Sequence, residues 1–292
     1  MTEKASLLID SRCSLGEGPF WHPGRQQLFW FDINNKAMFA ATPEGEVAQR
    51  WELPEIVAAG SIIDHDNLAV VTETGLKRFH LEHGMGETIM PIEADKTATR
   101  CNDSRVHPSG AFWIGTMDRG NEEGAIGALY HYRSGKLTPL KTDIRIPNAT
   151  CFAPDGRTTY WTDTPTKQIL KVATDPETGL PVGEWELFAD VSDEPGYPDG
   201  AVVDSEGYLW NAKWGGACVV RHAPDGSIER TIEVPVSQVS CPAFGGPDLK
   251  TMFLTTANKT MSAEQLAKEP TAGGIFSIKL DVAGLAEPDL AL

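Results

Sequence analysis

Four side chains with oxygen donors stand at one recurring offset in this sequence, five residues before a turn that contains Gly, Pro or both. They are Glu17, Asn102, Asn148 and Asp199. Carboxylate and amide oxygens are the donors that a hard divalent cation prefers, and two carboxylates would nearly neutralise its charge. Each residue taken alone also suits a turn, because Asn and Asp accept hydrogen bonds from their own backbone. The shared offset favours one cation site.

The turns that define this offset recur along the whole chain, and a short apolar run follows each one. They begin at residues 22, 64, 107, 153, 204 and 246, so the spacings are 42, 43, 46, 51 and 42 residues. A period in the forties with β-rich runs predicts the four-stranded blades of a propeller, whereas a β-sandwich would show this spacing only by accident. We therefore predict an all-β chain that folds as a six-bladed β-propeller with four-stranded blades.

The inner strands of a propeller line a central channel, so the residues at one repeat position should face that channel. The other two positions at this offset hold Ala59 and Cys241. We expect residues 1–292 to form a single domain in which Leu7-Leu-Ile9 completes the last blade. Only residues 262–268 have the pattern of a short helix, with Ser262 as its cap.

The composition is that of an ordinary globular protein, with 41% hydrophobic and 23% charged residues. Subtracting 41 acidic from 25 basic residues gives a net charge of −16, and the sequence has no cluster of Lys or Arg residues. We therefore expect no nucleic acid as partner. No apolar run approaches the roughly 18 to 20 residues of a membrane span, and the N-terminus meets a charge too early for a secretory signal. We expect a cytoplasmic protein with no membrane partner.

Other site chemistries find little support in the residues. The five cysteines are odd in number and form no Cys-x-x-Cys pair, which favours reduced, mostly buried thiols over disulfides or a zinc site. There is no Gly-x-Ser-x-Gly nucleophile elbow. His80 and His83 lack the spacing of a zinc-protease helix and are interpreted as a surface pair.

Aromatic residues divide into two groups. Trp21, Trp113, Trp161 and Trp210 occupy matching repeat positions and are expected to pack between blades. Tyr197 and Trp214 flank the strand of Asp199 and are better candidates for the walls of a pocket.

In combination, six motifs resemble the sugar-lactonase family, which includes gluconolactonases, senescence marker protein 30 (regucalcin) and bacterial xylono- and arabinonolactonases. The resemblance runs from about residue 13 to residue 280. The motifs are Leu15-Gly-Glu-Gly-Pro-Phe-Trp21, Arg100-Cys-Asn-Asp103, Gly115-Thr-Met117, Ile146-Pro-Asn148, Tyr197-Pro-Asp-Gly200 and Phe244-Gly-Gly-Pro-Asp-Leu-Lys250.

This resemblance implies a metal-dependent hydrolase of five- or six-carbon sugar lactones, with one divalent ion (Ca²⁺, Zn²⁺, Mn²⁺, Mg²⁺ or Fe²⁺). It implies Glu17, Asn148 and Asp199 as metal ligands, with Asp199 also the catalytic base. Arg100 and Asn102 would contact the substrate, although Asn102 could instead join the metal shell through water. Asp118, which follows Gly115-Thr-Met117, is a further expected substrate contact, within a loop that runs to Glu123.

Two alternatives to a sugar lactonase stay open. The same site could hydrolyse phosphotriesters or hydrophobic lactones, although the polar Arg100 and Asn102 favour sugars. The chain could also be a calcium-binding propeller that hydrolyses nothing. A propeller needs no partner to close, so we expect a monomer.

Overall fold

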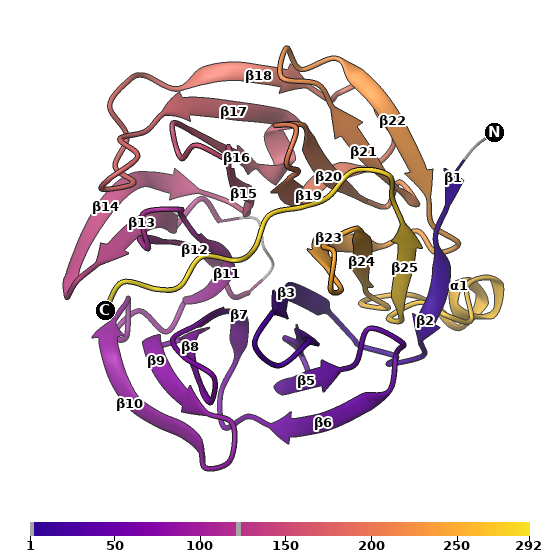
Figure 1. The fold of residues 1–292 in the computed structure, drawn as a ribbon, viewed down its shortest axis with the longest axis horizontal. Coiled ribbons are helices and arrows are strands. Elements are labelled where there is room, and N and C mark those ends of the chain that lie inside the picture. The colour runs from indigo at the N-terminus through magenta and orange to yellow at the C-terminus, as the bar shows by residue number, and fades with distance from the viewer. Residues whose placement is uncertain (1–2, 121–123) are drawn as a thin grey trace. The chain divides into compact units, whose positions relative to one another are not determined.

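Nearly all of the regular structure is β-strand. The computed structural model describes residues 3–120 and 124–292, and its strands form six sheets of four or five strands. These sheets are the expected blades, so the predicted fold class, an all-β six-bladed β-propeller, is confirmed. The chain divides into two compact units, and each unit holds three blades (Figure 1). Unit 1 comprises residues 1–52 and 191–286, and unit 2 comprises residues 53–190 and 287–292.

The blades of unit 1 are antiparallel sheets, two of which also receive an N-terminal strand. Blade 1 contains β3 (Gly16–His22), β4 (Gln27–Asp32), β5 (Ala37–Ala41) and β6 (Val47–Glu52). Blade 5 contains β19 (Tyr197–Val203), β20 (Leu209–Trp214), β21 (Cys218–His222), β22 (Ile228–Glu233) and β1 (Glu3–Lys4). Blade 6 contains β23 (Val239–Gly245), β24 (Thr251–Thr256), β25 (Ile275–Lys279) and β2 (Ser6–Ile9).

The blades of unit 2 are built from consecutive antiparallel strands. Blade 2 contains β7 (Val57–Ile62), β8 (Asn67–Thr72), β9 (Gly75–His80) and β10 (Gly84–Pro91). Blade 3 contains β11 (Thr99–Val106), β12 (Phe112–Asp118), β13 (Gly127–Arg133) and β14 (Lys136–Ile144). Blade 4 contains β15 (Pro147–Phe152), β16 (Thr158–Asp163), β17 (Gln168–Ala173) and β18 (Glu186–Asp190), with a 3₁₀ turn at Thr164–Thr166.

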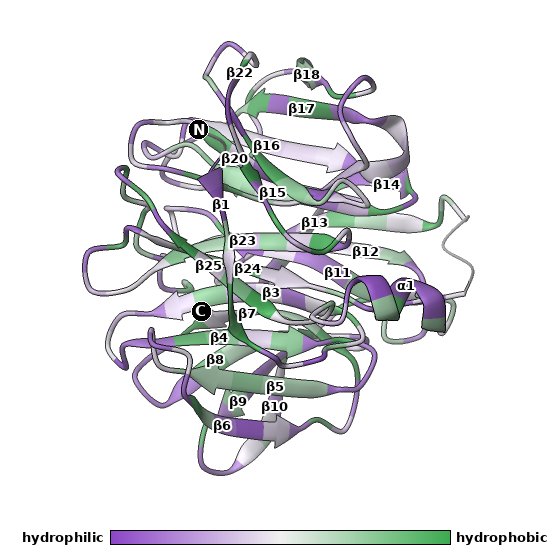
Figure 2. Cartoon of the chain, turned by 90° about the vertical axis from the view of Figure 1, so that its right-hand side faces the viewer, coloured by the Kyte–Doolittle hydropathy of each residue, from purple (hydrophilic) through white to green (hydrophobic). Residues whose placement is uncertain are grey.

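The first strand of each blade, here called the inner strand, is mostly buried, and the last holds few buried residues. In blade 1, five of the seven residues of β3 are buried and β5 is buried along its length, whereas most of β6 is exposed. Figure 2 shows the same contrast, with the hydrophobic colour on β5 and the hydrophilic colour on much of β6. Within unit 1, β3 and β19 both pack against β23, and within unit 2, β7 and β15 both pack against β11. The inner strands therefore lie next to one another within each unit.

The N-terminal segment joins two blades of unit 1. Strand β2 pairs antiparallel with β25 in blade 6, and β1 pairs parallel with β22 in blade 5 (Figure 1). Between the two strands, Ala5 is buried and its N–H donates to the carbonyl of Glu233 at 2.9 Å. Strands β1 and β2 thus cover sheet edges that would otherwise be unpaired.

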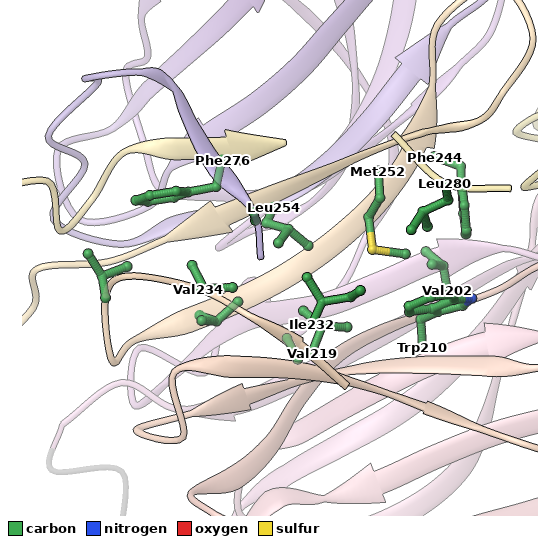
Figure 3. Close-up of a cluster of buried hydrophobic side chains, with 14 of the residues drawn as sticks. Val202, Trp210, Val219, Ile232, Val234, Phe244, Met252, Leu254, Phe276 and Leu280 are labelled. Carbon is green, nitrogen blue, oxygen red and sulfur yellow. The ribbon is translucent and has the colours of Figure 1, made fainter. Parts of the chain in front are cut away.

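A hydrophobic core fills the space between blades 5 and 6 (Figure 3). Full burial of each large apolar side chain stabilises the fold by about 1.5–3 kcal/mol. Alternation along β20 places Trp210 and Ala212 in this core and turns Asn211 to the opposite face of the blade. The core residues labelled in Figure 3 are Val202, Trp210, Val219, Ile232, Val234, Phe244, Met252, Leu254, Phe276 and Leu280.

The expected helix is present as α1 (Ala263–Lys268), capped by Ser262. The hydroxyl of Ser262 accepts the Gln265 N–H at 3.2 Å, and the Gln265 side chain accepts the Ser262 N–H at 2.8 Å. This reciprocal capping box satisfies two N–H groups at the start of the helix and explains why so short a segment is helical.

Two buried histidines make the stability of unit 2 depend on pH. Nε2 of His131 donates to the carbonyl of Thr178 at 2.8 Å, and Nε2 of His107 donates to that of Gly156 at 2.8 Å. Burial lowers the pKa of both imidazoles below their ordinary value of 6.5, so the unfolded chain binds more protons below that pH. Stability should therefore be full above about pH 6.5 and decline as the pH falls toward 5.

Urea unfolding of the wild type and of His131→Gln between pH 5 and 8 checks this expectation. The variant should be less stable throughout, with a smaller loss of stability on the acid side. The matched control His65→Gln removes an exposed histidine and should leave the free energy of unfolding at pH 8 close to that of the wild type. Identical pH dependence in the wild type and His131→Gln would contradict the assignment.

Candidate functional site

The inner strands are irregular at the predicted offset, because the pairing of each with its neighbour slips there. Slips of this kind are β-bulges, which bend the strand and re-aim the side chains around them. The four polar residues predicted from the offset lie in or beside these bulges. In unit 1 one slip lies between Glu17 and Phe20 on β3, and another between Pro198 and Ala201 on β19. In unit 2 one slip lies between Cys101 and Ser104 on β11, and another between Asn148 and Cys151 on β15.

Unit 1 contributes two carboxylates, on strands that share β23 as a neighbour. Asp199 is only 7% exposed, and Glu17 is half-buried. Oε2 of Glu17 accepts the N–H of Gly18 at 2.8 Å, and Gly18 adopts φ 55°, a left-handed conformation that glycine takes without strain. The hydroxyl of Ser240 on β23 donates to the carbonyl of Gly16, which holds β3 beside Glu17.

Unit 2 contributes a chain of hydrogen bonds through three buried side chains. Nη1 of Arg100 donates to Oδ1 of Asn102 at 3.0 Å and to the carbonyl of Cys101 at 2.9 Å. Nδ2 of Asn102 then donates to Oδ1 of Asn148 at 3.2 Å and to the carbonyl of Pro147 at 2.9 Å. The structure therefore brings Arg100, Asn102 and Asn148 together.

The far end of this chain fixes the orientation of the Asn148 amide. Its Nδ2 donates to Oγ1 of Thr164 at 2.8 Å, so its Oδ1 is directed toward Asn102. An amide oxygen has two lone pairs, and the bond from Asn102 uses one of them. Asn148 can therefore accept this bond and still offer its oxygen to a cation.

Asp118 lies at the end of β12, where it pairs in register with Thr99, the residue before Arg100. Its carboxylate bonds to its own loop, because Oδ1 accepts the Gly120 N–H at 2.8 Å and Oδ2 accepts the Gly124 N–H at 3.0 Å. Asp118 is therefore hydrogen-bonded to Gly120 and Gly124. Part of the predicted Asp118–Glu123 segment, residues 121–123, lies outside the described residues.

Two residues beside the predicted site were missed in the sequence. Asp103 accepts the Thr150 N–H at 2.8 Å, which ties β11 to β15, and burial raises the pKa of its carboxyl. Asn211 on β20 donates from Nδ2 to the carbonyls of Asp199 at 2.9 Å and Gly200 at 3.2 Å. The available signal was an amide that ends the apolar run Tyr208-Leu-Trp-Asn211.

The aromatic residues divide as predicted. Trp21, Trp113, Trp161 and Trp210 are all at most 2% exposed, which confirms their role in packing. Tyr197 is 47% exposed and pairs in register with Trp214, two residues before Asp199. Tyr197 and the half-buried Trp214 remain the predicted wall of a pocket.

The predicted ligand set fits a hard divalent cation by the chemistry of its donors. Within unit 1, Glu17 and Asp199 carry carboxylate oxygens, and within unit 2, Asn148 carries an amide oxygen whose orientation is fixed by hydrogen bonds. Oxygen-only donor sets suit Ca²⁺, Mg²⁺ and Mn²⁺. Across residues 3–120 and 124–292, no group of three or more His, Cys, Asp and Glu side chains could hold a metal ion.

All five cysteines are buried thiols, and Cys241 occupies one of the six predicted positions. Burial raises the pKa of Cys13 and Cys218 to about 11 and that of Cys101 to about 12. Because the thiolate is the reactive form, we expect none of the five to react with a thiol reagent at pH 8 until denaturant is added. Titration with a chromogenic disulfide checks this, and rapid reaction of one native thiol would contradict it.

Comparison with known proteins places these residues in a family. Residues 15–258 match the family described as SMP-30/gluconolactonase/LRE-like region. The L-arabinolactonase of Azospirillum brasilense is 36% identical, covering 97% of this chain and 94% of its own. Pentonolactonase XacC of Haloferax volcanii is 33% identical, covering 97% of this chain and 96% of its own.

A solved structure is similar over the full length of this chain. It is that of a calcium-binding protein, regucalcin, from Agrobacterium tumefaciens strain C58. It superposes with a TM-score of 0.96 at 35% identity, covering 100% of both chains. In the part of the chain that the structure describes, no helix is long and apolar enough to cross a membrane.

Proposed function

Because the chain belongs to the SMP-30/gluconolactonase/LRE-like family, we propose that it is a sugar lactonase, which adds water to the cyclic ester of a sugar lactone and releases the aldonic acid. The observation that carries this proposal is the similarity to an L-arabinolactonase and a pentonolactonase over 97% of the chain. Their names favour five-carbon lactones as substrates, with six-carbon lactones as the neighbouring class.

The proposed cofactor is one divalent cation, with Glu17, Asn148 and Asp199 as its ligands. When bound, such a cation would polarise the lactone carbonyl and lower the pKa of a water molecule. The oxygen donors favour Ca²⁺, Mg²⁺ or Mn²⁺, and Zn²⁺ and Fe²⁺ are the alternatives. The similarity to a calcium-binding regucalcin supports a divalent cation.

The roles of the side chains follow from their charges and hydrogen bonds. Asp199 is the proposed general base, because a carboxylate can take the proton of the attacking water. Arg100 is proposed to donate to the ring hydroxyls or to the developing oxyanion, and its bonds to Cys101 and Asn102 hold the guanidinium in one orientation before substrate binds.

Asn102 and Asp118 are proposed to bind the sugar. The Asn102 amide is already aligned by Arg100 and Asn148, although it could instead reach the cation through water. Each Asp118 oxygen accepts a backbone hydrogen bond and keeps further acceptor capacity for a sugar hydroxyl.

Acid release from purified protein tests this proposal. The panel comprises xylono-, arabinono-, galactono- and gluconolactone, followed with a pH indicator before and after chelation and with single metals restored. Chelator-sensitive hydrolysis well above the spontaneous rate is expected. A rate with paraoxon or a hydrophobic lactone and none with any sugar would redirect the site to those substrates.

A calcium-binding propeller without activity is the second candidate, favoured by the similarity to a protein named for calcium binding. It predicts that Ca²⁺ raises the melting temperature while no lactone or phosphotriester is hydrolysed. Calorimetry beside the substrate panel separates the two candidates.

We further propose that residues 1–292 act as a single-domain cytoplasmic monomer. The N-terminal strands close sheets of unit 1, and five buried thiols suit a reducing compartment. One cooperative unfolding transition and a monomeric mass by light scattering are expected. Two transitions would argue for separate domains.

A further inference from the structure

We propose that Asn211 is a positioning residue that holds the bulge of β19 in the shape that presents the Asp199 carboxylate. This inference rests on the proposed function, which makes Asp199 a metal ligand. Asn211 contacts the backbone of Asp199 and is not proposed to touch the metal or the substrate.

The bulge explains why a side chain is needed there. Pairing between β19 and β20 passes from Pro198 with Lys213 to Ala201 with Asn211, so Asp199 and Gly200 together oppose a single residue. Two residues opposite one cannot both keep the regular ladder, and buried carbonyl groups need another donor. The Asn211 Nδ2 supplies it, with bonds of 2.9 Å to Asp199 and 3.2 Å to Gly200.

The burial of Asn211 indicates that these bonds are the purpose of the amide. Asn211 is 0% exposed, and among the described residues its Nδ2 has these two carbonyl partners while its Oδ1 has none, so the donor end of the amide makes the contacts. Its neighbours Trp210 and Ala212 point into the apolar core of Figure 3, so the alternation along β20 aims Asn211 away from that core.

The other blades show that this position does not require an amide. In the run after each turn, the equivalent residue is apolar or a threonine. These residues are Phe31, Val71, Ile114, Thr162 and Thr255. Thr255 donates from its hydroxyl to the carbonyl of Cys241 at 3.1 Å, so blade 6 holds its inner strand with one side-chain bond where blade 5 has an amide that makes two.

Strand β23 confines the same bulge from the other side. A Cβ atom on Gly200 would lie 2.4 Å from Sγ of Cys241, so the backbone of Gly200 lies directly against this side chain. The backbone that follows Asp199 is thus held between the Asn211 amide and Cys241. Loss of the amide should leave one side of this clamp open and let the carboxylate move.

The test measures cation affinity and backbone protection in Asn211→Ala and Asn211→Ser. Calorimetric titration with Ca²⁺, or with Mn²⁺ if the wild type binds it more tightly, should show affinity about 10- to 100-fold weaker in Asn211→Ala. Asn211→Ser keeps one donor and should be intermediate. Hydrogen exchange of residues 199–203, measured without metal, should be faster in Asn211→Ala.

Thr174→Val is the matched control, because it removes another buried bond from a side chain to a backbone carbonyl, 3.0 Å long, in unit 2. It should lower the melting temperature and leave both cation affinity and the exchange of residues 199–203 unchanged. An equal loss of affinity in this control would overturn the positioning role. Wild-type cation affinity and wild-type hydrogen exchange in Asn211→Ala would also overturn the positioning role. If Asn211→Ala does not fold, the same measurements on Asn211→Ser decide the question.

Failure of the proposed function would look different. In that case the wild type itself would bind no cation and hydrolyse no lactone. The exchange of residues 199–203 would still show whether Asn211 holds the bulge. Unchanged exchange in the variants would overturn the inference independently.

Discussion

Asp199→Asn should reduce lactone hydrolysis by about 10²- to 10⁴-fold, the usual range for loss of a general base. The amide keeps the size of the side chain but cannot take a proton from water, and it brings a neutral oxygen in place of a charged ligand. Because Asp199 lies in a bulge whose backbone is held by Asn211, the backbone should stay in place. Initial rates on the preferred lactone, beside melting curves, measure the effect.

Glu17→Gln extends the same test to the second carboxylate of unit 1. It keeps an oxygen that can accept the Gly18 N–H, so the local turn should survive while the charge is lost. Activity should fall strongly, and added metal should recover part of it if the defect is in affinity. The control Asp225→Asn changes an exposed turn carboxylate of the same unit and should keep the wild-type rate. Full activity in both site variants would refute the assigned ligands.

Asp204→Ala should destabilise the protein by about 3 kcal/mol, because it removes the fully buried partner of Arg221 and leaves this guanidinium only with the more exposed carboxylates of Glu206 and Glu229. The Asp204 side chain is fully buried, and its Oδ2 accepts Nε and Nη2 of Arg221 at 2.9 and 2.7 Å and Nε1 of Trp210 at 2.8 Å. Its Oδ1 accepts the N–H groups of Glu206 at 2.9 Å and Tyr208 at 3.1 Å. Removal of the carboxylate leaves all of these donors without that acceptor.

Urea denaturation followed by tryptophan fluorescence measures this loss. Asp225→Ala is the matched control, because Asp225 also accepts backbone N–H in a blade turn but is exposed. It should cost no more than about 1 kcal/mol. Equal effects of the two substitutions would show that Asp204 acts only as a turn residue.

Most of the fold can be predicted from the sequence repeat, because the signals in the repeat are local. The turn Ala153-Pro-Asp-Gly156 is favoured by its own residues. Gly156 adopts φ 68°, and its N–H donates to the Ala153 carbonyl at 2.9 Å. Ser262 likewise caps its helix through residues three positions away. Such signals depend only on residues close in the chain, so they can be recognised without the tertiary structure.

Only part of the candidate site can be predicted from the sequence. The common offset identified Glu17, Asn102, Asn148 and Asp199, because equivalent positions in repeats have equivalent places in their blades. It could not show that Arg100 and Asn102 are bonded to one another. Nor could it show that the Asp118 carboxylate bonds to its own loop.

The blades, the turns and the residue types at the recurring position can be predicted from the sequence, because periodicity and turn chemistry are properties of short segments. The contacts of each polar group depend instead on how distant strands pair. Asp204 and Asp225 both belong to blade turns, yet only Asp204 is buried against Arg221 and Trp210. Asn211 ends an apolar run in the sequence, and only the structure shows that its amide donates to the bulge of the neighbouring strand β19. Hydrogen bonds between strands depend on register, and a slip of one residue changes every partner.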